Sequence, residues 1–255
     1  MSAEVYAGAV LTLAIAVTVL TGVAVAVSAA AGLGQVRALL VAVVRAAVQL
    51  AVVGVVIAAV FRTPTLAPLY LTVVLGAASW TSGRRIGGTR RDVLVAGASI
   101  AAGAGVAALV VFTTGALPWR AATGVPFVAQ LVGGSMTATT LSGQRFRDDV
   151  AAVWDQVEGW LALGARPARA VRSMGTRAAA RALAPALDQT RTVGLVTLPG
   201  AYVGLLLGGA TPLEAGKVQL LVLIGLLAAE TVAVVVATQL LGLRLGLRRP
   251  ADLRA

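Results

Sequence analysis

Long apolar runs separated by short polar stretches dominate this chain of 255 residues. A membrane-spanning helix needs about 20 predominantly apolar residues, and seven runs approach or exceed that length. The pattern predicts an all-α, polytopic membrane protein that forms one transmembrane domain over residues 1–255. The predicted spans are approximately Val5–Ala29, Ala38–Val60, Leu66–Ser82, Val93–Ala116, Val125–Ser142, Thr192–Leu207 and Val218–Leu241.

Composition supports lipid as the solvent of most of the chain. Hydrophobic residues make up 58% of the sequence, charged residues 12%, and the mean hydropathy is +0.91. Soluble domains carry about 25% charged residues, and a soluble fold of this length could not bury so much apolar surface. The net charge of +11 does not indicate nucleic-acid binding, because the basic residues are scattered between apolar runs.

The basic residues also predict an orientation. With seven spans, seventeen of the 21 Lys and Arg residues fall on one side of the membrane and three on the other, and Arg45 lies inside the second run. Cytoplasmic segments carry the excess of Lys and Arg. The distribution predicts a plasma-membrane protein with its amino terminus outside and its carboxyl terminus, including the basic tail after Gly242, in the cytoplasm.

The chain contains no Cys and no His, which removes disulfides, zinc sites, thiol nucleophiles and imidazole bases. A membrane-embedded enzyme is not expected, because one mid-membrane carboxylate provides no acid–base pair. A P-loop is missing as well: the only Gly-Lys pair, Gly216-Lys217, is followed by Val218. We therefore expect no cofactor in this chain, and ATP with Mg²⁺ would need a separate subunit.

The one long polar segment, Gly143–Arg191, has helical periodicity. Its apolar stripe stops at Gly164 and Pro167, and a second helix is predicted from Ala168 to Leu183 with arginines on its polar side. Two interpretations stay open: a hairpin lying on the membrane surface, or a docking element for a cytoplasmic partner. The stripe consists of Val150, Val153, Trp154, Val157 and Leu161.

The stretch EGWLALGARP within this loop resembles the "EAA" loop of ABC-transporter permeases, which has Glu and Gly six residues apart and often "ALGA" followed by Pro. Gly159 and Trp160 stand where that loop has two Ala. The resemblance implies that the loop docks on an ATP-binding subunit. The residues that would carry this coupling are Glu158, Trp160, Leu163, Gly164 and Pro167.

The resemblance extends along most of the chain. Gly133–Leu141 is similar to the "GNSMTATSL" stretch of the FetB-like iron-export permease family, with Gly134 in place of the usual Asn. Thr192–Gly200 is similar to its "TVGLVSLPG", and Pro212–Ala215 to its "PLEA". Membership would imply a homodimeric ABC permease that exports a metal ion such as iron, and the plant relatives of this family are associated with aluminium tolerance.

Two ionisable residues interrupt apolar runs and are candidates for the translocation path, because charges are costly in lipid. Arg45, with Gln49 one turn away, lies in the second run, and Glu230 lies midway along the seventh. Their depths permit an ion pair. The alternatives are a structural Arg–Glu clip between two helices and an Arg45 side chain that extends to the membrane surface.

The fifth run concentrates hydroxyl groups, which suit hard cations but also bond back to their own helix. Candidate path residues in this run are Ser135, Met136, Thr137 and Thr139.

In the sixth run, Gly200, Gly204 and Gly208 form a ladder of small residues that permits close helix approach. Pro199 is expected to kink or break that helix. We expect the ladder to serve packing within one protomer, with a dimer axis or the transport route as the alternative.

The sequence leaves one further function open. An ion-coupled secondary transporter that depends on Glu230 would need no ATPase and would follow an ion gradient. A receptor with seven helices is disfavoured, because the loop motif would then be accidental.

Overall fold

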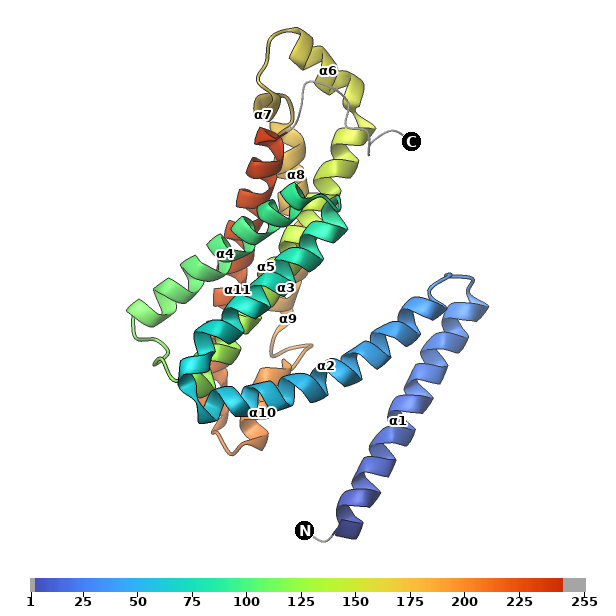
Figure 1. Cartoon of the computed structure of the whole chain (residues 1–255), viewed down its shortest axis with the longest axis vertical. Helices are drawn as coiled ribbons and strands as arrows, with labels where there is room; N and C mark the ends of the chain where they lie inside the picture. The colour runs from blue at the N-terminus through green and yellow to red at the C-terminus, as the bar shows by residue number, and fades with distance from the viewer. Residues whose placement is uncertain (1–2, 245–255) are drawn as a thin grey trace. The chain divides into compact units, whose positions relative to one another are not determined.

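The computed structural model describes residues 3–244, which are mostly helical and contain no strand (Figure 1). The basic tail predicted to lie in the cytoplasm is, after Arg244, outside the described residues. The helices are α1 (Ala3–Ala30), α2 (Val36–Arg62), the 3₁₀ turn η1 (Pro64–Leu66), α3 (Ala67–Ile86), α4 (Arg90–Thr113), α5 (Ala121–Ala152), α6 (Trp154–Ala162), α7 (Pro167–Ala170), α8 (Arg172–Ala182), α9 (Ala184–Thr192), α10 (Gly200–Leu207) and α11 (Pro212–Leu243).

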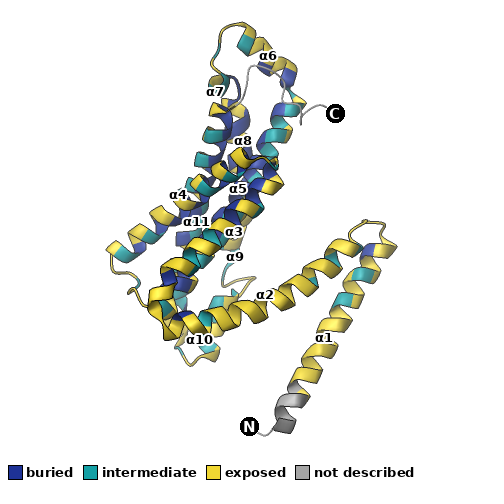
Figure 2. Ribbon diagram, in the orientation of Figure 1, coloured by how far each residue is buried: buried dark blue, intermediate teal, exposed yellow. Residues whose placement is uncertain are grey.

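The chain divides into two compact units, residues 1–63 and residues 64–255. The first unit consists of α1 and α2, joined by a short turn in which Gly32 and Gly34 adopt positive φ. Both helices are long and apolar enough to cross a membrane, yet no residue of their apolar windows is buried (Figure 2). Such helices need lipid or further protein around them, since water would leave their apolar side chains exposed.

In the second unit, α4 and α5 pack against each other and against both α3 and α11, around an apolar core. Glycines set the close contacts. A Cβ at Gly83 would overlap the backbone of Val93, and one at Gly103 would overlap the carbonyl oxygen of Ala229. Small residues are what allow membrane helices to approach closely, so these two positions fix the α3–α4 and α4–α11 interfaces.

Capping residues explain where two of these helices begin. Thr89 accepts a hydrogen bond from the backbone N–H of Asp92, whose carboxylate accepts one in return at the start of α4. Thr211 and Glu214 form the same reciprocal pair at the start of α11. Each capping box satisfies amide donors that a helix terminus otherwise leaves free.

The predicted number of seven spans is not confirmed. Among the described residues, α1, α2, α4 and α11 are both long and apolar enough to cross a membrane, and α3 and α5 have the length with a more polar sequence. The predicted sixth span, Thr192–Leu207, is not a continuous helix, and the predicted break at Pro199 is confirmed. Gly194 adopts a positive φ of 82°, and Pro199 precedes a helix of only 8 residues, about 12 Å long.

Instead of one continuous helix, a series of short helices with a non-helical stretch runs along the second unit; we call it the broken path. From α6 and α7 at one end, the chain returns through α8 and α9, then through the non-helical residues 193–199, to α10 at the other end (Figure 1). The single helix predicted for Ala168–Leu183 is interrupted at Val171. The second part of this segment, α8, packs against α5 and α11.

The close approach of α4 and α11 leads to the first prediction. The substitution Gly103→Ala should lower the thermal unfolding midpoint of the detergent-solubilised protein. The overpacked contact should reduce the free energy of unfolding by about 1–3 kcal/mol. Gly105→Ala, in the same helix, has no atom near the added Cβ and should be neutral or stabilising by about 0.5–1 kcal/mol. Circular dichroism melting curves compare the two, and equal midpoints would contradict this account of the interface.

Candidate functional site

A short helix follows α5 almost without interruption. Val153 alone separates α5 from α6. Trp154 and Val157 anchor α6 on the end of the second unit with 4% and 0% exposure, while Leu163, just after the helix, is 82% exposed. Glu158 is exposed too, as is the indole of Trp160. The helix therefore has a fixed face and a face open to a partner.

The segment after α6 turns sharply. Gly164 has a φ of 85°, a conformation that glycine adopts without steric cost, and Pro167 is the first residue of α7. The predicted stop at Gly164 and restart at Pro167 are confirmed. Trp160 and Leu163 line a hollow of about 760 Å³ beside this turn. All five predicted coupling residues thus lie within one exposed element, which we call the α6–α7 element.

Two ion pairs fasten the end of α5 that carries this element. The guanidinium of Arg147 lies 3.0 Å from the carboxylate of Asp92 on α4, and Asp92 is almost fully buried. Asp149 is paired with Arg181 on α8. The sequence did not predict either ion pair, because nothing in the pattern relates positions so far apart in the chain.

Three of the four segments predicted to share one side of the membrane meet at this end of the second unit. The amide of Gln144 donates to the backbone carbonyl of Arg85 at 3.1 Å, and Arg244 donates to the carbonyl of Arg91 at 2.8 Å. The turn between α3 and α4, the end of α5 and the end of α11 are therefore adjacent. This grouping is what the distribution of basic residues predicts.

A groove of about 290 Å³ lies on the second unit, between α5, the α8–α9 segment and α11. Four polar side chains line it from three helices: Gln130 and Thr137 of α5, Gln189 of α9 and Glu230 of α11. Thr137 and Glu230 are predicted path residues, and the structure brings them together. The remaining lining residues are Gly133, Gly134, Ala138, Leu141, Ala182, Pro185, Ala186 and Leu226.

Gly134 makes room for the carboxylate of this groove. A Cβ at that position would lie 2.7 Å from Oε1 of Glu230 and 2.6 Å from Leu226. Glu230 is half-buried and has no hydrogen-bond or ion-pair partner among residues 3–244. The similar family stretch has Asn at this position, so the glycine exchanges a polar side chain for direct access to the carboxylate.

The other hydroxyl-bearing candidates lie elsewhere. Ser135 and Thr139 are fully buried, and within the described part of the chain their hydroxyl oxygens have no hydrogen-bond partner. Met136 packs against the apolar core. Thr137 donates to the carbonyl of Gly133 at 3.2 Å, and Thr140 similarly donates to its own helix. Of the predicted path residues of α5, only Thr137 reaches the groove.

Arg45 and Gln49 are exposed on α2 in the first unit, so their relation to Glu230 stays a prediction. In the sixth run, Pro199 is the residue before α10. Around Gly200 and Gly204, no side chain of the described structure comes within 4 Å of an added Cβ, and Gly208 meets only its own helix. Within the second unit the ladder glycines have no close neighbour, and their packing within the protomer or at a dimer axis stays a prediction.

Sequence comparison places these features in a family. The model of the uncharacterised protein family UPF0014 matches residues 10–245. The chain belongs to this family.

Three relatives of this chain come from two plants and a bacterium. The chain is 36% identical over 201 residues to "Protein ALUMINUM SENSITIVE 3" of Arabidopsis thaliana, covering 77% of this chain and 72% of that protein. It is 36% identical over 213 residues to "UPF0014 membrane protein STAR2" of Oryza sativa subsp. japonica, with coverages of 82% and 74%. The "Probable iron export permease protein FetB" of Escherichia coli is 29% identical over 198 residues, with coverages of 77% and 76%. No solved structure matches.

Membership in UPF0014, together with several apolar helices of spanning length, establishes a multi-pass membrane protein. FetB is named as a probable permease and STAR2 as a membrane protein, which agrees with a transport subunit rather than an enzyme.

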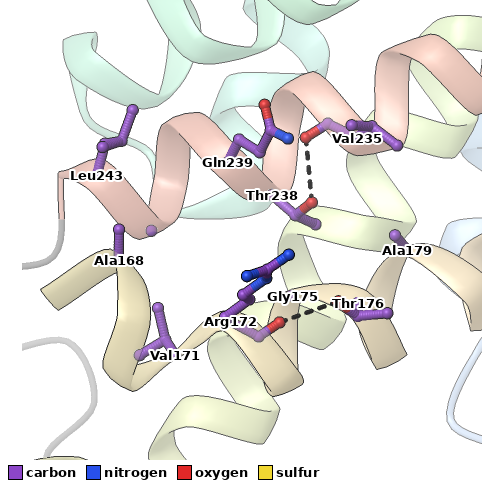
Figure 3. A pocket seen from close by; sticks show the side chains of 11 residues that line it. Ala168, Val171, Arg172, Gly175, Thr176, Ala179, Val235, Thr238, Gln239 and Leu243 are labelled. Carbon is purple, nitrogen blue, oxygen red and sulfur yellow. Dashed lines mark hydrogen bonds between the residues drawn. The ribbon is translucent and has the colours of Figure 1, made fainter.

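A second cavity, of about 480 Å³, is lined by residues of α7, α8 and α11 (Figure 3). The hydroxyl of Thr238 donates to carbonyl oxygens of its own helix, and Thr176 donates to the carbonyl of Arg172. These hydroxyls are satisfied locally, so Arg172 and Gln239 are the remaining polar side chains of the cavity. Beside this cavity α8 still approaches α11 closely, since a Cβ at Gly175 would lie 3.5 Å from Thr238.

Sequence reasoning missed two members of the groove in this UPF0014 chain. Gln130 could have been found, because it lies four residues before Gly134 and seven before Thr137, on one helical face. Gln189 could not, since it reaches the groove only because α9 folds back along the unit.

The ion pair of Asp92 leads to the second prediction. Asp92→Asn should lower the free energy of unfolding by about 1–3 kcal/mol, because it removes a charged hydrogen-bond partner at a buried position. Asp149→Asn, which breaks a pair with an exposed Arg181, should cost less than about 1 kcal/mol. Chemical denaturation in detergent measures both; the reverse order would show that the α4–α5 pair does not fasten this end.

Proposed function

We propose that this chain is the membrane-spanning subunit of an ABC transporter, driven by a separate ATP-binding subunit and exporting a metal ion such as iron. The α6–α7 element carries the proposal. A short helix anchored by Trp154 and Val157 presents Glu158, Trp160 and Leu163 to the outside. An amphipathic helix with exposed anchors is suited to a groove on a partner protein.

The relatives support the same function. FetB carries the name of an iron export permease, and its alignment covers most of this chain. In the proposed arrangement, two copies of the chain form a homodimer in the plasma membrane, with the α6–α7 element in the cytoplasm and the amino terminus outside. ATP and Mg²⁺ bind only to the partner subunits.

The mechanism follows from the continuity of α5. Its 32 residues lead from the groove, around Gly134, to the residue before α6. Closure of the ATP-binding subunits displaces α6, and α5 transmits this displacement as a rigid body to the groove. The ion pair of Arg147 with Asp92 passes the movement to α4. Alternating access then results from α5 shifting against the broken α8–α10 path.

A second candidate is an ion-coupled secondary transporter. It is favoured by the unpaired carboxylate of Glu230, since membrane-embedded carboxylates also occur in proton and ion relays. This candidate needs no ATP-binding partner. The two proposals therefore differ in whether transport depends on ATP hydrolysis by a second subunit, which can be measured.

The third prediction tests the proposed function. The tagged chain, purified from its native membranes in mild detergent, should retain a P-loop subunit, identified by mass spectrometry, and should hydrolyse ATP. Leu163→Ser should reduce both the retained subunit and the ATP hydrolysis by about tenfold, the effect of losing roughly 1.4 kcal/mol of contact.

The matched control is Leu213→Ser, which changes a leucine exposed to a similar degree on the first turn of α11. It should leave partner retention unchanged. Cation flux from vesicles containing the chain alone, driven by an ion gradient and indifferent to ATP, would overturn the ABC assignment in favour of the secondary transporter.

A further inference from the structure

The carboxylate of Glu230 lies where a charge is costly. Glu230 is 18 residues after the start of α11 and 13 before its end, about 27 Å and 20 Å along the helix. No hydrogen bond or ion pair satisfies it within the described residues. An ionisable side chain at this depth is retained when it serves a ligand, a relay or a pairing partner.

The surface around Glu230 is also polar. Gln130, Thr137 and Gln189 line the same groove, and Asp188 and Arg191 of α9 are exposed beside it. Lipid tails offer these groups no hydrogen bonds. This face therefore needs protein and water over it.

The backbone supports the same conclusion. Residues 193–199, which follow α9, are not helical, and Gly194 is held by a turn in which it donates to the carbonyl of Thr197 at 2.9 Å. Irregular backbone at membrane depth is tolerated only where protein buries it or where it lines a water-filled cavity. Residues 193–199 expose Leu195, Val196 and Leu198, so we expect protein rather than water to cover this backbone beside the groove.

The atoms that line the groove and could bind a metal ion indicate the class of ligand. They are oxygens: one carboxylate, two side-chain amides and one hydroxyl. Because Thr137 donates its hydrogen to Gly133, the lone pairs of its oxygen remain free to bind a cation. The chain has no Cys or His, which are the ligands of softer metals. Carboxylate, amide and hydroxyl oxygens suit hard cations.

One chain has too few of these donors. Hard divalent cations take six or more oxygen ligands, and residues 3–244 contain no group of three or more acidic or histidine side chains able to hold a metal. The groove supplies four side chains with a single negative charge. A second copy facing the first would double this set and provide two carboxylates.

We propose that the Glu230 groove is one half of a binding site for a hard, multivalent cation, completed by the same groove of a second copy of this chain. The site rests on the proposed function, in which the bound cation is the cargo of a homodimeric transporter. Gly134 is a specificity position of the site, because a side chain there would displace the carboxylate from the space it occupies.

The experiment uses the full-length chain in nanodiscs, without any ATP-binding subunit, and Mn²⁺ as the probe. Electron paramagnetic resonance of free Mn²⁺ should give one high-affinity ion per two chains. Glu230→Gln should weaken this binding at least about tenfold, since affinity follows the number of charged ligands. Gly134→Ala should also weaken Mn²⁺ binding, although this variant keeps the Glu230 carboxylate.

Two matched variants control for general damage. Glu214→Gln changes the other carboxylate of α11 and keeps the capping box, because Gln also serves in that position. Gly105→Ala, on α4 and away from the groove, adds a Cβ that meets no atom within 4 Å. Both should bind Mn²⁺ as the unaltered chain does. Binding that is unaffected by Glu230→Gln, or no binding at all, would overturn the site.

Cross-linking tests the second copy independently. The chain has no native Cys, so Gln130→Cys places one thiol at the groove, and Leu109→Cys places one at an exposed position of α4. A short thiol-specific linker should join two chains through residue 130 and not through residue 109. One Mn²⁺ per chain, or the reverse cross-linking pattern, would contradict a shared site.

These outcomes separate the two proposals. Loss of the cation site with an ATP-binding subunit still retained refutes this inference alone. A Glu230-dependent site in a chain that retains no such subunit refutes the ABC assignment alone.

Discussion

The continuity of α5 is the constraint on which this structure depends. A single 32-residue helix carries three of its features: the glycine that admits the Glu230 carboxylate, the arginine paired with Asp92, and the end from which α6 departs. Because an α-helix is stiff along its axis, the groove and the α6–α7 element cannot move independently while α5 is intact. The small residues of α3, α4 and α11 then fix how closely the neighbours follow it.

Lipid as solvent explains the rest of the second unit. Apolar helices need no special reason to lie in a membrane, whereas the polar α9 and the non-helical residues 193–199 do. Gln189 of α9 lines the groove, which gives that helix a polar surface to face. The ladder of Gly200 and Gly204 on α10 has no close neighbour within the second unit.

Much of this organisation could be predicted from sequence. Apolar run lengths gave the long helices, and the stop at Gly164 and restart at Pro167 placed the α6–α7 element, because turn chemistry is local. The grouping of basic segments at one end followed from charge alone. These properties depend on neighbours in the chain or on the membrane, both of which the sequence records directly.

Prediction failed where the answer depends on tertiary packing. For the run Thr192–Leu207 the sequence predicts the break at Pro199, but not the turn at Gly194 or the polar α8–α9 segment before it. Ser135 and Thr139 face the interior of the second unit and not the groove. Their direction depends on how α5 is rotated against α4 and α11, which hydroxyl content does not encode.

The central claim is that α5 couples the α6–α7 element to the Glu230 groove. The most direct measurement is the affinity of the groove for Mn²⁺ in the chain bound to its ATP-binding subunits, first without nucleotide and then trapped with ATP and vanadate. The account predicts an affinity change of about tenfold or more, equivalent to a coupling free energy of at least about 1.4 kcal/mol. An affinity that is the same in both states would contradict it.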